Sequence, residues 1–267
     1  MAQDTAALRS RLREDLRHRI RPMTGRDPSE SGRAGTPLEL LYDLTYVVAF
    51  AAAAEQLAHH VEQGDVGSAL GAYTFAVFAI SWAWMNFTWF SSAYGNDDAL
   101  FRVATIAQMV GVVVLTFGLP VSFDDAAHGD SPFNAVMLIG YMIMRVPLVA
   151  LWLRAAKEDP DHRETALAYA VLIAVAQACW VAVIVVPLSV AVTVTALVVL
   201  ALGEMVAPVL LERRFGRAPW NAGHIAERFG LLTLITLGEV VAATTAAVAA
   251  TTSPSVISVS RPKRSAM

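Results

Sequence analysis

The feature that most constrains this chain is a series of apolar blocks of about 20 residues each, running from about residue 38 to residue 250. A helix rises about 1.5 Å per residue, so each block can cross the roughly 30 Å hydrocarbon core of a bilayer. Charged residues make up only 16% of the chain, below the roughly 25% of a soluble domain. A soluble α/β enzyme would alternate shorter apolar strands with amphipathic helices. The pattern therefore predicts an all-α, polytopic transmembrane helical bundle.

The chain divides into an N-terminal segment (1–35), a transmembrane domain (36–250) and a polar tail (251–267). About seven spans are expected within the transmembrane domain. They cover residues 38–58, 67–90, 99–122, 133–154, 164–186, 188–211 and 224–250. Only "PLS" separates the fifth from the sixth, which predicts a tight helical hairpin.

The N-terminal segment is rich in arginine. Leu8, Leu12, Leu16 and Ile20 recur every four residues among these arginines. This spacing predicts a basic amphipathic helix on an anionic membrane surface, and a frayed, solvated tail is the alternative. The following "MTGRDPSESGRAG" is expected to be a flexible linker.

Lysine and arginine also gather in two later loops. These are Arg154, Lys157 and Arg163 after the fourth span, and Arg213, Arg214 and Arg217 after the sixth. Because basic loops favour the cytoplasmic side, the N-terminus is expected in the cytoplasm. Seven spans then put "RPKR" (261–264) outside. Either a last span that does not cross fully or a C-terminally shortened chain would explain this.

The acidic residues inside the apolar blocks are the candidate functional groups. "TPLE" (36–39) predicts a helix start in which Glu39 closes a capping box. Asp43 lies roughly 9 Å into the hydrocarbon, Glu204 roughly 10 Å and Arg145 roughly 14 Å from the same face. An intramembrane Asp costs about 2.5–3.5 kcal/mol on insertion scales, so a partner is expected. These three charges are predicted to share one layer, either as a static ion pair or as a site for a proton, ion or polar substrate.

Glu239 lies deeper, roughly 22 Å from that face, and no basic residue shares its depth. It is expected to be protonated or to face a water-filled cavity. The buried acids are predicted to face a shared wet interior. Supporting polar positions are Glu39, Glu55, Asn86, Arg102, Glu227 and Arg228.

Several function classes compete. A retinal photoreceptor is excluded because Lys157 and Lys263 lie outside the spans. Glu55 and His59 are four residues apart and His60 is adjacent, but this ligand set is thin for a metal enzyme, so any metal stays unknown. In the absence of a catalytic motif we expect no enzyme activity and no cofactor. Buried acids fit a transporter, channel or proton-coupled carrier, and a non-transporting scaffold or stress-related membrane component is the alternative. The expected partners are the bilayer, anionic lipids bound by the N-terminal arginines and a second copy of the chain, but no nucleic acid.

Three segments carry a family resemblance. "PLELLYDLTYVVAFAAAAEQLAHH" (37–60), "HIAERFGLLTLITLGEVVAA" (224–243) and the tryptophan-rich "WAWMNFTWFSSAYGNDDALFRVATIAQM" (82–109) resemble the bacterial low temperature requirement A family. The resemblance implies a multi-pass protein of the bacterial cell (inner) membrane, without a reaction or substrate that carries over. The residues that coincide with the family's signature polar positions are Glu39, Asp43, Glu227, Arg228, Gly238 and Glu239. Members are usually longer after the glutamate block, so a C-terminally shortened member is expected.

Overall fold

The computed structural model describes residues 20–30 and 32–252 of the chain. Its helices are α2 (Pro37–Glu62), α3 (Val66–Tyr94), α4 (Ala99–Phe117), α5 (Leu119–Ala127), α6 (Ala135–Glu158), α7 (Arg163–Val185), α8 (Val190–Phe215) and α9 (Ala222–Thr252). The amphipathic helix expected before Ile20 and the tail after Thr252 lie outside the described residues.

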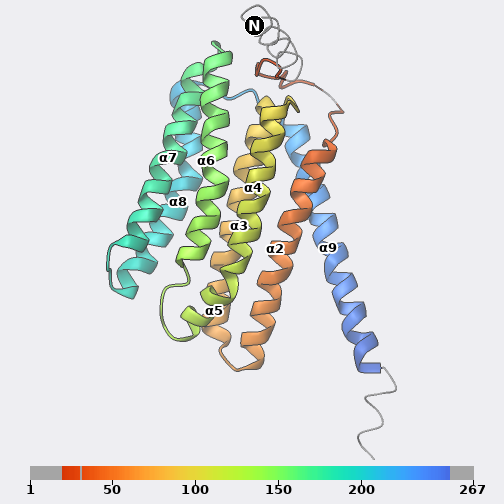
Figure 1. Cartoon of the computed structure of the whole chain (residues 1–267), viewed down its shortest axis with the longest axis vertical. Coiled ribbons are helices and arrows are strands. Elements are labelled where there is room, and N and C mark those ends of the chain that lie inside the picture. Colours follow the sequence, from red (N-terminus) through yellow and green to blue (C-terminus); the bar gives the residue numbers. More distant parts are fainter. Residues whose placement is uncertain (1–19, 31, 253–267) are drawn as a thin grey trace, which may run out of the picture.

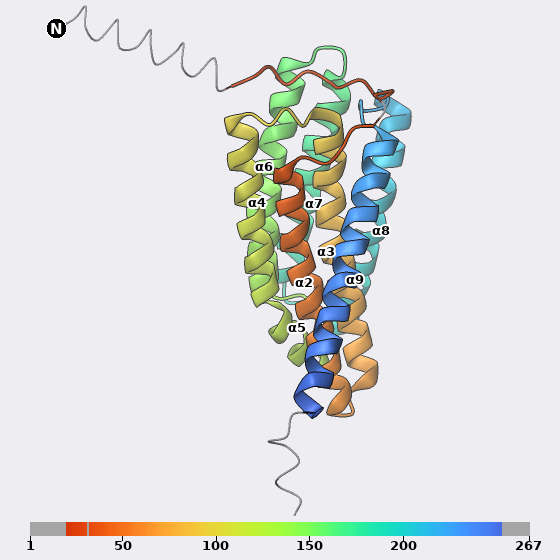
Figure 2. The same cartoon turned by 90° about the vertical axis from the view of Figure 1, so that its right-hand side faces the viewer.

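The long helices run side by side along one axis and form a single bundle (Figures 1 and 2). Along one side, α4 packs against α2 and α6, α6 packs against α7, and α7 packs against α8. The last helix, α9, packs against α2 and α3 at the edge of the bundle. Adjacent spans are antiparallel because the connecting loops are short.

Length and composition agree with a membrane-spanning bundle. Within the described residues, six helical segments are long and apolar enough to cross a bilayer, with α4 and α5 counted as one segment, Ala99–Ala127. The 31-residue α9 runs beside α2 and is long enough to be a seventh. Large apolar side chains such as Val103 (66% exposed) and Leu210 (58% exposed) cover the outside, as expected where lipid is the solvent. The predicted all-α transmembrane bundle is confirmed.

Local sequence explains where the helices begin. Thr36 accepts a hydrogen bond from the Glu39 amide, and the Glu39 carboxylate accepts one from the Thr36 amide, so the predicted capping box is confirmed. The Asp98 side chain caps α4 by accepting a hydrogen bond from the Phe101 amide, and the Asn134 side chain caps α6 by accepting one from the Met137 amide. The tight hairpin between the fifth and sixth spans is also present, since α7 ends at Val185 and α8 begins at Val190.

Glycine sets how closely α4 and α6 approach each other. A Cβ atom on Gly140 would lie 2.5 Å from the Leu115 backbone nitrogen and 2.8 Å from the Gly111 carbonyl oxygen. No side chain fits at these distances. The two backbones therefore touch here, as is common where small residues face each other between membrane helices.

The segment before α2 is hydrogen-bonded to the bundle. Its residues 20–30 and 32–36 lie across the end of the bundle that holds the α3–α4, α6–α7 and α8–α9 loops (Figure 2), which we call the basic end. The Arg26 amide donates to the Ala93 carbonyl at 3.0 Å, and the Arg33 guanidinium donates to the Ser91 and Ser92 carbonyls. The segment thus satisfies carbonyls at the end of α3, and its flexibility stays a prediction.

Candidate functional site in the bundle core

The first buried charge cluster joins α2, α3 and α9, and we call it the Asp43 cluster (Glu39, Asp43, Trp84, His224 and Arg228). Arg228 Nη2 donates to Asp43 Oδ1 at 2.5 Å, and Trp84 Nε1 donates to the same oxygen at 2.6 Å. Arg228 Nη1 lies 3.9 Å from Glu39 Oε1, and His224 Nε2 lies 3.5 Å from Glu39 Oε2. Two acids of α2 thus meet an arginine and a histidine of α9.

Helical spacing accounts for this arrangement. Glu39 and Asp43 are four residues apart on α2, and His224 and Arg228 are four residues apart on α9. Residues at this spacing share one helix face, so two complementary faces come together where α9 packs against α2. All four side chains are buried.

The Asp43 cluster keeps unused hydrogen-bonding capacity. Asp43 Oδ2, Arg228 Nε and both ring nitrogens of His224 have no hydrogen-bond partner in the described part of the chain. Arg228 Nη1 also donates to Ser91 Oγ at 3.0 Å. Unsatisfied buried polar atoms are costly, so a cluster that retains several of them is a candidate for binding a proton or a small polar group.

The second cluster joins α3, α6, α7 and α8, and we call it the Glu204 cluster (Trp82, Tyr141, Arg145, Trp180 and Glu204). Arg145 Nη2 lies 3.4 Å from Glu204 Oε2. The indole nitrogens of Trp82 and Trp180 each donate to the Glu204 carboxylate at 2.5 Å. The Arg145 side chain is 2% exposed and the Glu204 side chain 10%, and the Arg145 guanidinium carbon lies 5.2 Å from the centre of the Tyr141 ring.

The expected shared layer is therefore only partly found. Arg145 does pair with Glu204, but Asp43 pairs with Arg228, whereas its depth predicts that it shares a layer with Arg145. Depth along the membrane normal limits which charges can meet, and the rotation of each helix then selects the partner. Removal of Arg145 would thus leave one carboxylate, that of Glu204, without its arginine partner, and would not affect the pair of Asp43 with Arg228.

Glu239 joins neither cluster. Its side chain is exposed on α9, as are those of Leu237 and Val240 nearby in the helix. The structure therefore does not bring Asp43, Glu204 and Glu239 to one shared interior.

The remaining predicted positions are mostly peripheral. Glu55 and Glu227 are exposed, and Arg102 forms an exposed ion pair with Asp97 at 2.7 Å. Asn86 is partly buried and donates to the Trp82 carbonyl. His60 lies 3.5 Å from Asp124, and within the described residues no group of three or more His, Cys, Asp or Glu side chains is placed to hold a metal ion.

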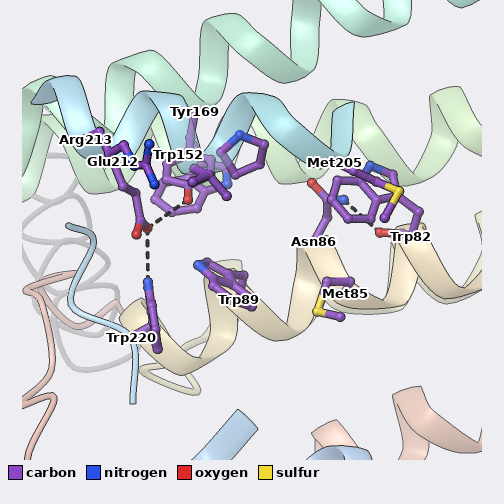
Figure 3. A pocket seen from close by; sticks show the side chains of 12 residues that line it. Trp82, Met85, Asn86, Trp89, Trp152, Tyr169, Met205, Glu212, Arg213 and Trp220 are labelled. Atoms are coloured by element: carbon purple, nitrogen blue, oxygen red, sulfur yellow. Dashed lines mark hydrogen bonds between the residues drawn. The ribbon is translucent and has the colours of Figure 1, made fainter. Parts of the chain in front are cut away.

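Two cavities lie between α3 and α8. The one nearer the basic end, which we call the basic-end cavity, has a volume of about 460 Å³ and is walled mainly by tryptophan and methionine (Figure 3). The other, the opposite-end cavity, has a volume of about 480 Å³ and extends from Ser68 and Asp130 along α8. Met205 borders both cavities. Trp82 lines the basic-end cavity and donates to Glu204, which precedes Met205 in α8, so the Glu204 cluster adjoins the basic-end cavity.

Several residues of these sites were not singled out from the sequence. They are Trp82, Trp84, Trp180 and His224 as partners of buried charges, and Glu212 as a carboxylate that lines the basic-end cavity. The four-residue spacing of His224 and Arg228, which mirrors that of Glu39 and Asp43, is a signal that could have identified the partner of Asp43. No comparable signal indicates which indole N–H groups meet a carboxylate.

Comparison with known proteins identifies the family of the chain. No curated protein and no solved structure matches it, but a family model does. Residues 34–260 match the family described as bacterial low temperature requirement A protein (LtrA). The match spans most of the chain and includes both buried charge clusters. This multi-pass helical membrane protein belongs to the bacterial low temperature requirement A family.

Proposed function

We propose that the chain is a transporter- or channel-like protein that handles protons, ions or a small polar solute through its buried carboxylates. The observation that supports this most directly is that the buried Arg145–Glu204 pair lies beside a cavity: Trp82, which donates to Glu204, lines the basic-end cavity, and Met205, the next residue after Glu204, borders both cavities. A pair that only fixed helix packing would need no cavity beside it.

The chemistry of the pair suggests how a solute would pass. Glu204 accepts two indole N–H groups and lies 3.4 Å from Arg145. A proton or cation that reaches Glu204 would compete with Arg145 for the carboxylate, and the two indoles would keep the carboxylate in place during the exchange. Loss of one partner of a buried ion pair typically costs about 3–5 kcal/mol, so binding of the proton or cation must supply a comparable free energy.

We also propose that the basic end faces the cytoplasm and that the chain lies in the bacterial cell (inner) membrane. Arg154, Lys157, Arg213 and Arg214 all belong to the helix ends at this face, and the positive-inside rule assigns such a face to the cytoplasm. Exposed arginines there would also attract anionic headgroups, at about 1 kcal/mol for each residue near the surface.

Flux measurements test this proposal. The full chain would be reconstituted into liposomes that contain a pH-sensitive dye, and proton, K⁺ and Na⁺ gradients would be imposed in turn. We expect flux in the wild type, and at least a tenfold loss of flux with Glu204→Gln. We expect Glu239→Gln to leave flux unchanged, because Glu239 is exposed on α9 and belongs to neither cluster.

Glu227→Gln is the matched control, because Glu227 is exposed on α9 outside both clusters. We expect it to leave flux unchanged. Absence of flux under every gradient from protein that stays folded would contradict the proposal and favour a membrane scaffold.

A further inference from the structure

The basic-end cavity has features that restrict which ligand it can hold. Its volume of about 460 Å³ falls within the roughly 300–1,000 Å³ of known small-molecule sites. α3 forms one wall and α8 the other, and aromatic rings from α6, α7 and the α8–α9 loop close it (Figure 3). The residues that matter for recognition are Trp82, Trp89, Trp152, Tyr169, Glu212 and Trp220.

The aromatic rings pack against one another and hold the walls in place. Trp152 stacks on Tyr169 with ring centres 4.4 Å apart, and Trp89 lies at an angle to Trp220 with centres 4.8 Å apart. The faces of such rings carry partial negative charge and attract organic cations. Trp220 already attracts one, since the Arg217 guanidinium carbon lies 3.6 Å from its ring centre.

A carboxylate is fixed beside these rings. Glu212 Oε1 accepts a hydrogen bond from the Tyr169 hydroxyl at 2.9 Å and one from Trp220 Nε1 at 3.0 Å. Both bonds go to one oxygen, and Oε2 has no hydrogen-bond partner among the described residues. Glu212 also lies in the last turn of α8, where the helix dipole adds to the attraction for cations.

Two positive charges compete with a bound cation: Arg213, which borders the same cavity, and Arg217, which lies over the Trp220 ring. Both side chains are exposed, so water and salt screen their charges more than that of the half-buried Glu212. The local field inside the cavity is therefore set by the carboxylate and the ring faces.

We infer that the basic-end cavity binds a small amphipathic organic cation, in which an ammonium or quaternary ammonium group lies against the aromatic rings near Glu212 and an apolar body lies along Met85 and Met205. As a statement about a carried solute, this inference rests on the proposed function. The binding itself can be measured without transport.

Benzyltrimethylammonium is a suitable probe, because it joins a quaternary ammonium to one aromatic ring. Its binding to the purified full chain in detergent would be measured by calorimetry and by quenching of tryptophan fluorescence, next to neutral benzyl alcohol and anionic benzenesulfonate. We expect saturable binding of the cation, at least about tenfold tighter than binding of either comparison compound.

Glu212→Gln removes the charge and keeps an acceptor oxygen for Tyr169 and Trp220. We expect it to weaken cation binding about tenfold. Glu164→Gln is the matched control, because Glu164 lies at the start of α7 and lines a different surface hollow. Arg213→Gln is expected to leave the affinity unchanged or to raise it, and this variant tests the site even if Glu212→Gln does not fold.

Equal binding of benzyl alcohol and the cation would overturn the inference, and so would tighter binding of benzenesulfonate or weaker cation binding by Arg213→Gln. The two proposals can fail separately. Cation binding without any flux would contradict only the transport proposal, whereas Glu204-dependent flux without cation binding would contradict only the inference about the cavity.

Discussion

Replacement of Arg228 by leucine tests whether the Asp43 cluster is held by electrostatics. Arg228 is fully buried and is 2.5 Å from Asp43, 3.9 Å from Glu39 and 3.0 Å from Ser91 Oγ. Arg228→Leu keeps an apolar side chain at the α2–α9 contact but removes the one arginine that faces both carboxylates. The two acids would then be buried without compensation by this cation.

Two considerations set how much Arg228→Leu lowers the free energy of unfolding. Loss of one partner of a buried ion pair typically costs about 3–5 kcal/mol. Protonation limits this cost, because an ordinary Asp takes up a proton at pH 7 for about 4 kcal/mol. Both routes give a loss of about 4 kcal/mol in the free energy of unfolding. Since protonation relieves the strain, the loss should shrink as the pH is lowered.

The assay is unfolding of the purified protein in mixed micelles by titration with sodium dodecyl sulfate, followed by circular dichroism at several pH values. Asp43→Asn combined with Arg228→Leu should recover part of the lost stability, since it removes one of the two uncompensated charges. Arg102→Leu is the control, because the Arg102–Asp97 pair is 58% and 41% exposed and exposed pairs contribute little. If Arg228→Leu were as stable as the wild type, or the double variant no better than Arg228→Leu, the electrostatic explanation would be refuted.

Three further predictions concern stability. Arg145→Leu should cost less than Arg228→Leu, about 1–3 kcal/mol in the same unfolding assay, because Glu204 keeps two indole N–H donors; an equal or larger loss would contradict this. Gly140→Ala should lower stability by about 1–3 kcal/mol, because its Cβ would lie 2.5 Å from backbone of α4, whereas Gly203→Ala, which has open space around it, should not. Burial raises the pKa of Asp98, but hydrogen bonds from its arginine partner and from the Phe101 amide outweigh burial and lower it below its ordinary value. The contribution of ionised Asp98 to the free energy of unfolding is therefore present above the ordinary Asp pKa of about 3.9 and is lost as the pH falls through the lowered value. The Asp98→Asn variant lacks this contribution, so it should be destabilised less than the wild type as the pH falls from 5 to 2.

The fold was accessible from the sequence because hydropathy and helix caps are local signals. Six of the seven apolar blocks each became one helix whose ends lie within a few residues of the expected ones, and the third became α4 and α5, which divide at Gly118. Thr36 and Glu39 form the predicted capping box. The position of residues 20–30 and 32–36 could not be predicted, for the opposite reason. Their glycines and serines indicate a loop, but hydrogen bonds to Ala93, Ser91 and other distant residues place this loop against the bundle, and no local pattern reveals them.

The candidate site was only partly accessible. Charged residues inside apolar blocks had to find partners, and Arg145 and Glu204 did so at the predicted depth. Asp43 found Arg228 because α9 packs against α2, a neighbour relation that depth along the membrane normal does not contain. Depth also fails to predict the surroundings of Glu239. It does not say whether the side chain points into the bundle or away from it, and the side chain is exposed.

The cavities depend on how far α3 and α8 stand apart, and the sequence carries no direct measure of that distance. Tryptophans near a membrane face are typical of an interfacial aromatic belt. In the structure Trp82 instead donates to Glu204, while Trp89 lines the basic-end cavity. An aromatic residue near a membrane face can thus serve either role, and only its helix face decides which.

The central claim of this account is that the space between α3 and α8 at Glu204 is reached by water and not only by lipid. The most direct test is labelling of Met205→Cys, in a Cys179→Ser background, with a charged methanethiosulfonate reagent that does not cross membranes. Val110→Cys is the matched control, because the two side chains are 48% and 52% exposed and lie at a similar depth, about 15 Å from the basic end. We expect Met205→Cys to react at least tenfold faster than Val110→Cys, and benzyltrimethylammonium to slow that reaction. Equal and negligible labelling at both positions would contradict the claim, because it would mean that Met205 faces acyl chains.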